Sequence, residues 1–156
     1  MTRVGCLPDE TTDSPMTHAT HQPRLQALIL ADHVYSDAQT GKKVVAGTFN
    51  RLWAGSFPTQ FSRNTFAYIS ITDIRNRVSL ELRYVDNKDL SVLLRAEPLE
   101  VEGTDPLATL EFAMAIPPFP MPHPGSYSFE LHANGEKLGS VRVLVAQLAQ
   151  EQEPDQ

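Results

Sequence analysis

Apolar and polar side chains alternate with a period of two along most of this chain. In VSLELRYVD, residues 78–86, apolar side chains stand at positions 78, 80, 82 and 84, and the side chains between them are polar. Such alternation is typical of a strand with one buried and one solvent-facing side. The pattern recurs, and no segment between the two ends of the chain shows a convincing helical period. We predict eight strands, at about 24–34, 43–50, 64–73, 78–86, 89–101, 107–116, 125–133 and 136–146.

Turn-forming residues separate these runs. Asn134-Gly135 is a strong short-range hairpin signal and joins the last two strands. Residues 74–77 and 86–88 join two other pairs of strands. Gly139 interrupts the alternation of the last strand, and a β-bulge there would return the later valines to the inner face.

Short strands at regular spacing predict an all-β fold, an antiparallel two-sheet β-sandwich of immunoglobulin-like or jelly-roll-like type. A closed barrel is the alternative. The sandwich is favoured because two connections, 51–63 and 117–124, are long enough to cross between sheets. The second connection is rich in proline, which lacks a backbone N–H, so it cannot form an interior strand.

The domain organisation follows from composition. Residues 1–22 are rich in Thr, Asp, Pro and His without periodicity, which predicts a disordered N-terminal arm. Residues 23–147 are expected to form the β-sandwich, and residues 148–156 a flexible acidic tail.

Cysteine content, hydropathy and charge narrow the class of protein. The single cysteine, Cys6, cannot form an internal disulfide, so we expect a cytoplasmic protein. No apolar run approaches the ~20 residues of a membrane-spanning helix, so we expect no membrane partner. The net charge of −6 argues against nucleic-acid binding, which needs clustered cations.

The charge is unevenly distributed. Residues 36–95 carry a local charge of +4, and residues 96–156 a local charge of −8. Pairing between strands of the two halves would mix these charges across one surface. Alternatively, two opposed patches would drive self-association or bind a charged partner.

Several motifs together carry a family resemblance. They are LILADHVYSDAQTGK, VVAGTFNRLWAGSFP, the tripeptide ITD at residues 71–73 and PGSYSFELHANGEKLGS at residues 124–140. With these motifs the chain resembles a family of uncharacterised bacterial proteins that share a domain of unknown function. The resemblance covers most of residues 25–145 and leaves out both ends. It is consistent with a β-sandwich and implies no activity, cofactor or catalytic residue.

Four residues are the candidates for a polar site: Asp32, His33, Asp37 and Asp73. A carboxylate beside an imidazole can orient a general base or supply metal ligands. Neighbours on a strand point to opposite faces, however, so Asp32 and His33 serve one centre only if the strand ends or bulges there. Asp37 lies in a predicted turn, where aspartate is common.

The remaining histidines and the cysteine give weaker signals. His18 and His21 lie in the predicted arm, and Cys6 lacks the formed pocket that lowers a thiol pKa. His123 lies between two prolines with no carboxylate close in sequence, which favours a structural or solvent-facing role. We predict no metal site and no cofactor.

Aromatic residues in the long connections are the candidates for binding. Trp53, Phe57 and Phe61 lie in the connection 51–63, and Phe119 and Met121 in the proline-rich connection. Large side chains in an exposed loop are candidate interface anchors. The alternative is that they fold back and close one end of the sandwich. Tyr127, by analogy with immunoglobulin-like sandwiches, is predicted to be structural and to hydrogen-bond a nearby backbone group.

Three functions remain open. The first is a non-catalytic interaction domain that binds a protein or self-assembles. The second is a metal-dependent or hydrolytic enzyme that uses Asp32, His33 and Asp73. The third is a small-ligand or carbohydrate-binding module that uses Trp53 as a stacking platform.

Overall fold

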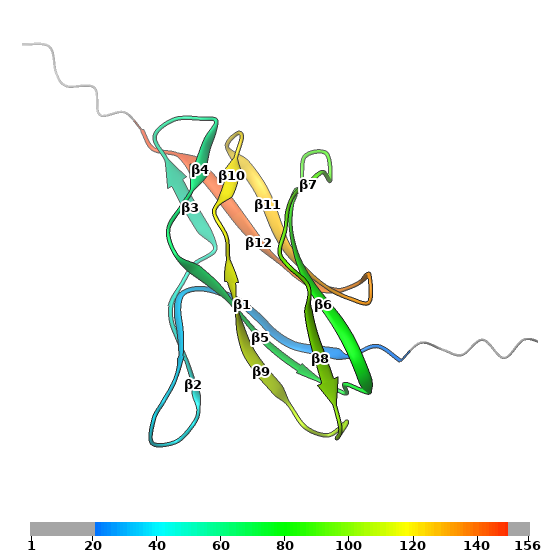
Figure 1. Ribbon diagram of the computed structural model, residues 1–156. Coiled ribbons are helices and arrows are strands. Elements are labelled where there is room, and N and C mark those ends of the chain that lie inside the picture. Colours follow the sequence, from blue (N-terminus) through cyan, green and yellow to red (C-terminus); the bar gives the residue numbers. More distant parts are fainter. Residues whose placement is uncertain (1–20, 150–156) are drawn as a thin grey trace, which may run out of the picture.

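The computed structural model describes residues 21–149, which form two facing sheets and a short two-stranded sheet at one end (Figure 1). The strands are β1 (Arg24–Ser36), β2 (Lys43–Thr48), β3 (Arg51–Ala54), β4 (Thr59–Phe61), β5 (Thr65–Thr72), β6 (Asn76–Asp86), β7 (Val92–Arg95), β8 (Leu99–Gly103), β9 (Leu110–Ile116), β10 (Phe119–Met121), β11 (Gly125–Ala133) and β12 (Glu136–Gln147). Residues 1–20 of the predicted arm, including Cys6 and His18, and residues 150–156 of the predicted tail lie outside the described residues.

The sheet topology confirms the predicted all-β sandwich. Sheet A has the strand order β2-β1-β5-β9, and sheet B has the order β3-β12-β11-β6-β7, with β8 also paired to β6. β4 and β10 form the third sheet. Strand pairs are antiparallel except β3 with β12, which is parallel. The far halves of β1 and β2 extend as a hairpin beyond the facing sheets (Figure 1).

The predicted alternation produces the core between the sheets. In β6 and β11 the inward positions are buried and the intervening positions are mostly half-buried. β5 lies in the middle of sheet A, and most of its side chains are buried. Burial of these alternating apolar side chains is the main favourable contribution to folding.

The strands differ from those predicted in three places, of which one is β10 in the connection 117–124. The strand expected at 89–101 is divided into β7 and β8, which pair with different halves of β6. The division falls at Pro98, because proline has no N–H for the ladder and restricts the residue before it. The connection 51–63 contains β3 and β4, whose runs of four and three residues are too short to give a periodic signal.

The predicted turn chemistry is confirmed in the last hairpin. Asn134 and Gly135 both have positive φ, at 49° and 84°. This is the combination that a type I′ turn requires. The pairing of β11 with β12 shifts between Leu131 and His132, so that Leu138 is the extra residue of a bulge beside Gly139.

The two long connections close one end of the sandwich. In the proline-rich connection, Phe119 and Met121 have exposed fractions of 1% and 3%, and both belong to the core. The ring centroid of Phe119 lies 5.0 Å from that of Phe61 and 4.8 Å from that of Tyr84. β10 pairs only with β4 among the described residues, so its proline occupies no interior position of a sheet.

Tyr127 occupies the predicted structural position. Its ring is fully buried, and its hydroxyl donates a hydrogen bond to the backbone oxygen of His123 at 2.6 Å. Its ring stacks on Tyr84 at a centroid distance of 5.2 Å. By contrast, the buried Tyr84 hydroxyl has no hydrogen-bond partner among the described residues.

These two tyrosines give a matched test. A buried hydroxyl without a partner carries an uncompensated desolvation cost, so we expect Tyr84→Phe to leave the free energy of unfolding unchanged or raise it by about 1 kcal/mol. Tyr127→Phe removes a formed hydrogen bond and should lower it by about 1 kcal/mol. Urea unfolding of the two variants measures both effects. A clear loss of stability in Tyr84→Phe would contradict the assignment.

Candidate functional site

The structure does not bring the predicted polar residues together. Asp32 and His33 are both exposed on β1, and no hydrogen bond joins them. Asp73 follows Thr72, which pairs with Arg24 at the other end of β1. Eight residues of strand separate Arg24 from Asp32, which corresponds to about 26 Å. These residues therefore form no common centre.

The three aspartates among the four predicted polar residues each make local contacts, and His33 makes no side-chain hydrogen bond within residues 21–149. The Asp32 carboxylate lies over Gly47, where the positive φ of 72° and the lack of space for a Cβ both require glycine. Asp37 accepts hydrogen bonds from the N–H groups of Gln39 and Thr40, with the larger effect from Thr40, and these bonds lower its pKa. Such bonds are typical of an aspartate that forms a turn.

Asp73 takes part in a surface ion-pair cluster. Its carboxylate lies 2.6 Å from Nε2 of His21 and 3.3 Å from Nε of Arg75. Within residues 21–149 there is no group of three or more His, Cys, Asp or Glu side chains that could hold a metal ion.

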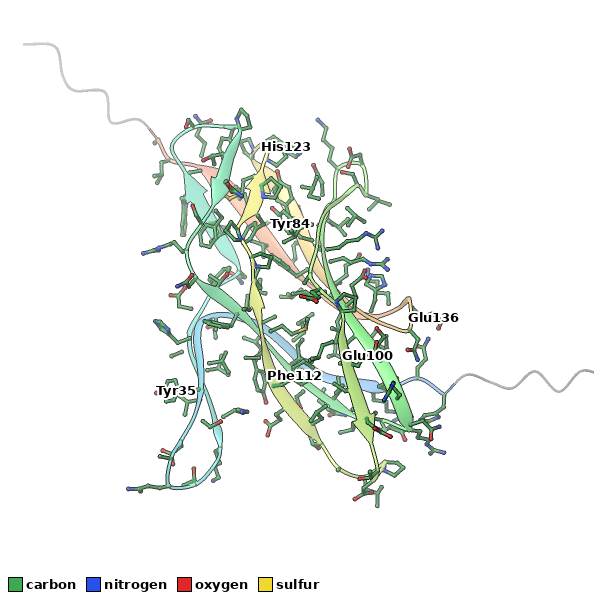
Figure 2. All side chains as sticks on the ribbon, viewed as in Figure 1. Tyr35, Tyr84, Glu100, Phe112, His123 and Glu136 are labelled. Atoms are coloured by element: carbon green, nitrogen blue, oxygen red, sulfur yellow. The ribbon has the colours of Figure 1, made fainter. Side chains whose placement is uncertain are left out.

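An aspartate–histidine pair that sequence reasoning missed lies at the closed end of the sandwich. Nε2 of His123 is 2.6 Å from a carboxylate oxygen of Asp86, which is buried. His123 comes from the proline-rich connection and Asp86 from the end of β6, so 37 residues separate them in sequence. Figure 2 shows His123 at the end of the molecule opposite the hairpin that carries Tyr35. Only the tertiary fold brings this imidazole to its carboxylate.

Both ring nitrogens of His123 are engaged. Nδ1 lies 2.8 Å from the backbone oxygen of Pro124, and Nε2 faces the Asp86 carboxylate. Both partners are acceptors, so both nitrogens donate only when the imidazole is protonated. The Pro124 carbonyl and then the Asp86 carboxylate raise the pKa of His123. Both ring nitrogens face acceptors of this chain, so neither is open to a substrate in this arrangement, and the pair is a structural clamp.

The most distinctive surface lies on the outer face of sheet B, at its β3–β12 edge. Cα pairing places Arg51 beside Leu144 and Trp53 beside Ala146. Leu148 continues the same alternating phase, and its N–H bonds to the backbone oxygen of Ala54. Arg142 precedes Leu144 by two positions on β12 and shares its face. We call this region the β3–β12 surface and define it by six residues: Arg51, Trp53, Arg142, Leu144, Ala146 and Leu148.

Three large apolar side chains are exposed on the β3–β12 surface. Trp53 is 55% exposed, Leu144 38% and Leu148 53%. Of the other binding candidates in the two connections, Phe57 and Phe61 are half-buried and pack against the core, and Phe119 and Met121 lie within it. Trp53 is thus the one loop candidate whose side chain stands mostly in solvent.

A polar hollow borders this surface. It has a volume of about 580 Å³, and its lining residues are Asn87, Leu90, Ser126, Ser128, Ser140 and Arg142. The side-chain amide of Asn87 donates to Oγ of Ser126 and accepts from the hydroxyl of Ser128. Ser126 pairs with Leu144 across the strands, so the hollow and the apolar residues adjoin.

Farther along the same face, charged side chains neutralise one another. Glu81 contacts Arg83 and Arg95, and their proximity, led by the hydrogen bond from Arg83, lowers its pKa. Glu130 lies 2.9 Å from both Lys137 and His132. Desolvation opposes its ionisation, but these two partners outweigh it and lower the pKa of Glu130.

The model of a family of unknown function, DUF6941, matches residues 26–146. The chain belongs to this family. The match covers the sandwich from β1 to β12, which confirms the family resemblance seen in the sequence.

Other comparisons give only weak likenesses. Among curated proteins, none matches this sequence. A structure of an immunoglobulin-like protein from Pseudomonas aeruginosa shares 13% identity, with 81% of this chain and 98% of that chain covered and a TM-score of 0.36. A DNA-bound alkylpurine DNA glycosylase from Pseudomonas fluorescens shares 10% identity over 76% of this chain, with a TM-score of 0.42. This chain spans 30% of the glycosylase's length.

No helix within the described residues is long and apolar enough to cross a membrane.

The His123 clamp gives a prediction about pH. Because the folded-state pKa of His123 is raised, the clamp stabilises fully below about pH 6.5, the ordinary imidazole pKa, and this contribution is lost as the pH rises through the folded-state value. We expect urea midpoints of the wild type to fall across that window, and His123→Gln to lack this step. His33→Gln, at an exposed histidine, is the matched control and should keep it. An unchanged step in His123→Gln would show that another group titrates.

Proposed function

We propose that this chain is a non-catalytic interaction domain that binds another protein through the β3–β12 surface. One observation carries the proposal. Three of the eight large hydrophobic side chains exposed among the described residues, Trp53, Leu144 and Leu148, gather at one edge of one sheet face. Contiguous exposed apolar side chains are typical of interaction sites, whereas isolated ones need no explanation.

The composition of this surface supports the proposal. Trp and Arg are the residues most enriched among those that dominate binding energy in protein interfaces. Arg51 and Arg142 flank the apolar side chains, and neither has an ion-pair partner within residues 21–149. The strands β3 and β12 carry five of the six residues, and Leu148 follows β12 directly with its N–H bonded to the backbone oxygen of Ala54. Little conformational entropy is therefore lost when a partner binds.

The enzyme hypothesis finds no support in the described residues. Its three residues lie at the two ends of β1, and the one histidine held by a buried aspartate has no free nitrogen. The carbohydrate hypothesis would need Trp53 to face a concavity. The hollow beside it is lined by other residues, so stacking of a sugar in it is not favoured.

Quantitative co-purification tests the proposal. Tagged wild-type chain, Trp53→Ala and Leu144→Ser would be compared by isotope-labelled mass spectrometry of retained proteins. We expect both variants to lose at least ten-fold of one or more specific partners, since an interface anchor contributes about 2 kcal/mol or more. Their thermal midpoints should change little, because both side chains are exposed.

Leu107→Ser is the matched control, because Leu107 is 91% exposed and lies in the β8–β9 connection, away from the β3–β12 surface. It should retain every partner. Equal retention by all four proteins would refute the proposed surface. Light scattering of the wild type and Trp53→Ala identifies the case in which the partner is a second copy, as a doubled mass that falls in the variant.

A further inference from the structure

The hollow beside the β3–β12 surface offers hydrogen-bond donors. Ser126 accepts a bond from Asn87 at 2.9 Å, so its own hydroxyl proton stays available. Ser140 and Arg142 also line the hollow, and neither has a side-chain hydrogen-bond partner among the described residues. The guanidinium of arginine presents a fork of N–H groups that matches a carboxylate. Within residues 21–149 no carboxylate lines the hollow.

The charge of Arg142 is not balanced by its neighbours on the sheet. Arg142 pairs in register with Ser128, and the nearest acidic position on the same face is Glu130, two residues along β11. Glu130 is already held by Lys137 and His132 at 2.9 Å each. In a chain of net charge −6, a cation beside hydroxyl donors and without an acidic partner is complementary to an anionic ligand.

Leu90, at the rim of the hollow, provides an independent observation. It is 73% exposed and has a φ of 61°, in the left-handed region that favours glycine or asparagine. A leucine in this conformation carries a steric cost, because its Cβ lies too close to the following carbonyl oxygen. An exposed apolar side chain held in a strained turn is one of the features that mark binding sites. Leu90 thus places an apolar side chain in the hollow, and Leu144 places another beside it.

We propose that the hollow binds a carboxylate on an acidic segment of the protein partner, while apolar side chains of that segment rest on Trp53, Leu144 and Leu90. This rests on the proposed function and names the chemistry that it recognises. A carboxylate suits the site better than a phosphate. The hollow holds one guanidinium, and Asp89, in the turn that borders it, would repel a dianion more strongly than a monoanion.

Peptide display on the full chain tests this chemistry. A random library of twelve-residue peptides would be selected against the wild type and against Arg142→Glu. We expect wild-type selections to be enriched in Asp or Glu next to Leu, Ile or Phe. The charge reversal should remove the acidic enrichment and favour Lys or Arg instead, a change that a purely structural role of Arg142 would not produce.

The sole tryptophan of the chain reports binding directly, because it lies on the β3–β12 surface. A selected acidic peptide should shift Trp53 fluorescence, and its amide counterpart with Gln for Glu should bind at least ten-fold more weakly. Leu90→Gly should raise the stability of the chain, because glycine adopts this φ without strain, yet it should weaken binding of the peptide. Arg77→Glu, which reverses the charge of an exposed arginine at the start of β6, is the matched control and should bind as the wild type does.

Three outcomes would overturn the inference. They are selections without acidic enrichment, identical selections from Arg142→Glu, and a peptide that is displaced equally well by millimolar inorganic phosphate. If no peptide binds, the inference is also overturned, and a shift of Trp53 fluorescence on removal of residues 150–156 would point to the chain's own acidic end as the competing occupant. Peptides that need Trp53 but ignore Arg142 would leave the proposed function standing and reject only the carboxylate.

Discussion

The contact of Tyr84 with three other rings is the interaction on which the rest of the structure depends. Its ring centroid lies 4.8 Å from that of Phe119, 4.9 Å from Phe129 and 5.2 Å from Tyr127. These rings come from β6, β10 and β11, so one cluster joins sheet B to the proline-rich connection. Aromatic rings bury large apolar areas and add specific pairwise geometry. The cluster therefore fixes the closed end of the sandwich, although the Tyr84 hydroxyl is left without a partner.

The closed end in turn positions the groups of the proposed site. Tyr127 and the clamp between His123 and Asp86 hold the proline-rich connection against the end of β6. Asn87, which follows Asp86, bonds to Ser126 and Ser128 and so sets the wall of the hollow. The opposite wall comes from β12, whose outer edge accepts β3 in parallel and thereby exposes Trp53. A rigid scaffold that presents a few exposed side chains is the common arrangement of interaction domains.

The sequence was informative wherever a signal is local. The period of two predicted the strands of the core, Asn134-Gly135 predicted the last hairpin, and Gly139 predicted the β-bulge in its second strand. It was uninformative where pairing supplies the structure. β3, β4 and β10 are too short for periodicity and exist because a partner strand lies beside them. The pair of Asp86 and His123 was also not predicted. The two residues are 37 positions apart in sequence, and only the fold brings their side chains together.

The amino-acid sequence alone thus determined the all-β class, the alternating core and the family, because side-chain period and turn residues act over a few positions. Only the tertiary structure decided the fate of the aromatic residues in the long connections. The residue type of an aromatic side chain in a connection does not tell whether its ring packs into the core or faces solvent. Strand pairing buries Phe119 in the core and leaves Trp53 exposed, near two arginines and the polar hollow. The residues that line this hollow come from several separate segments of the sequence, so no one segment predicts it.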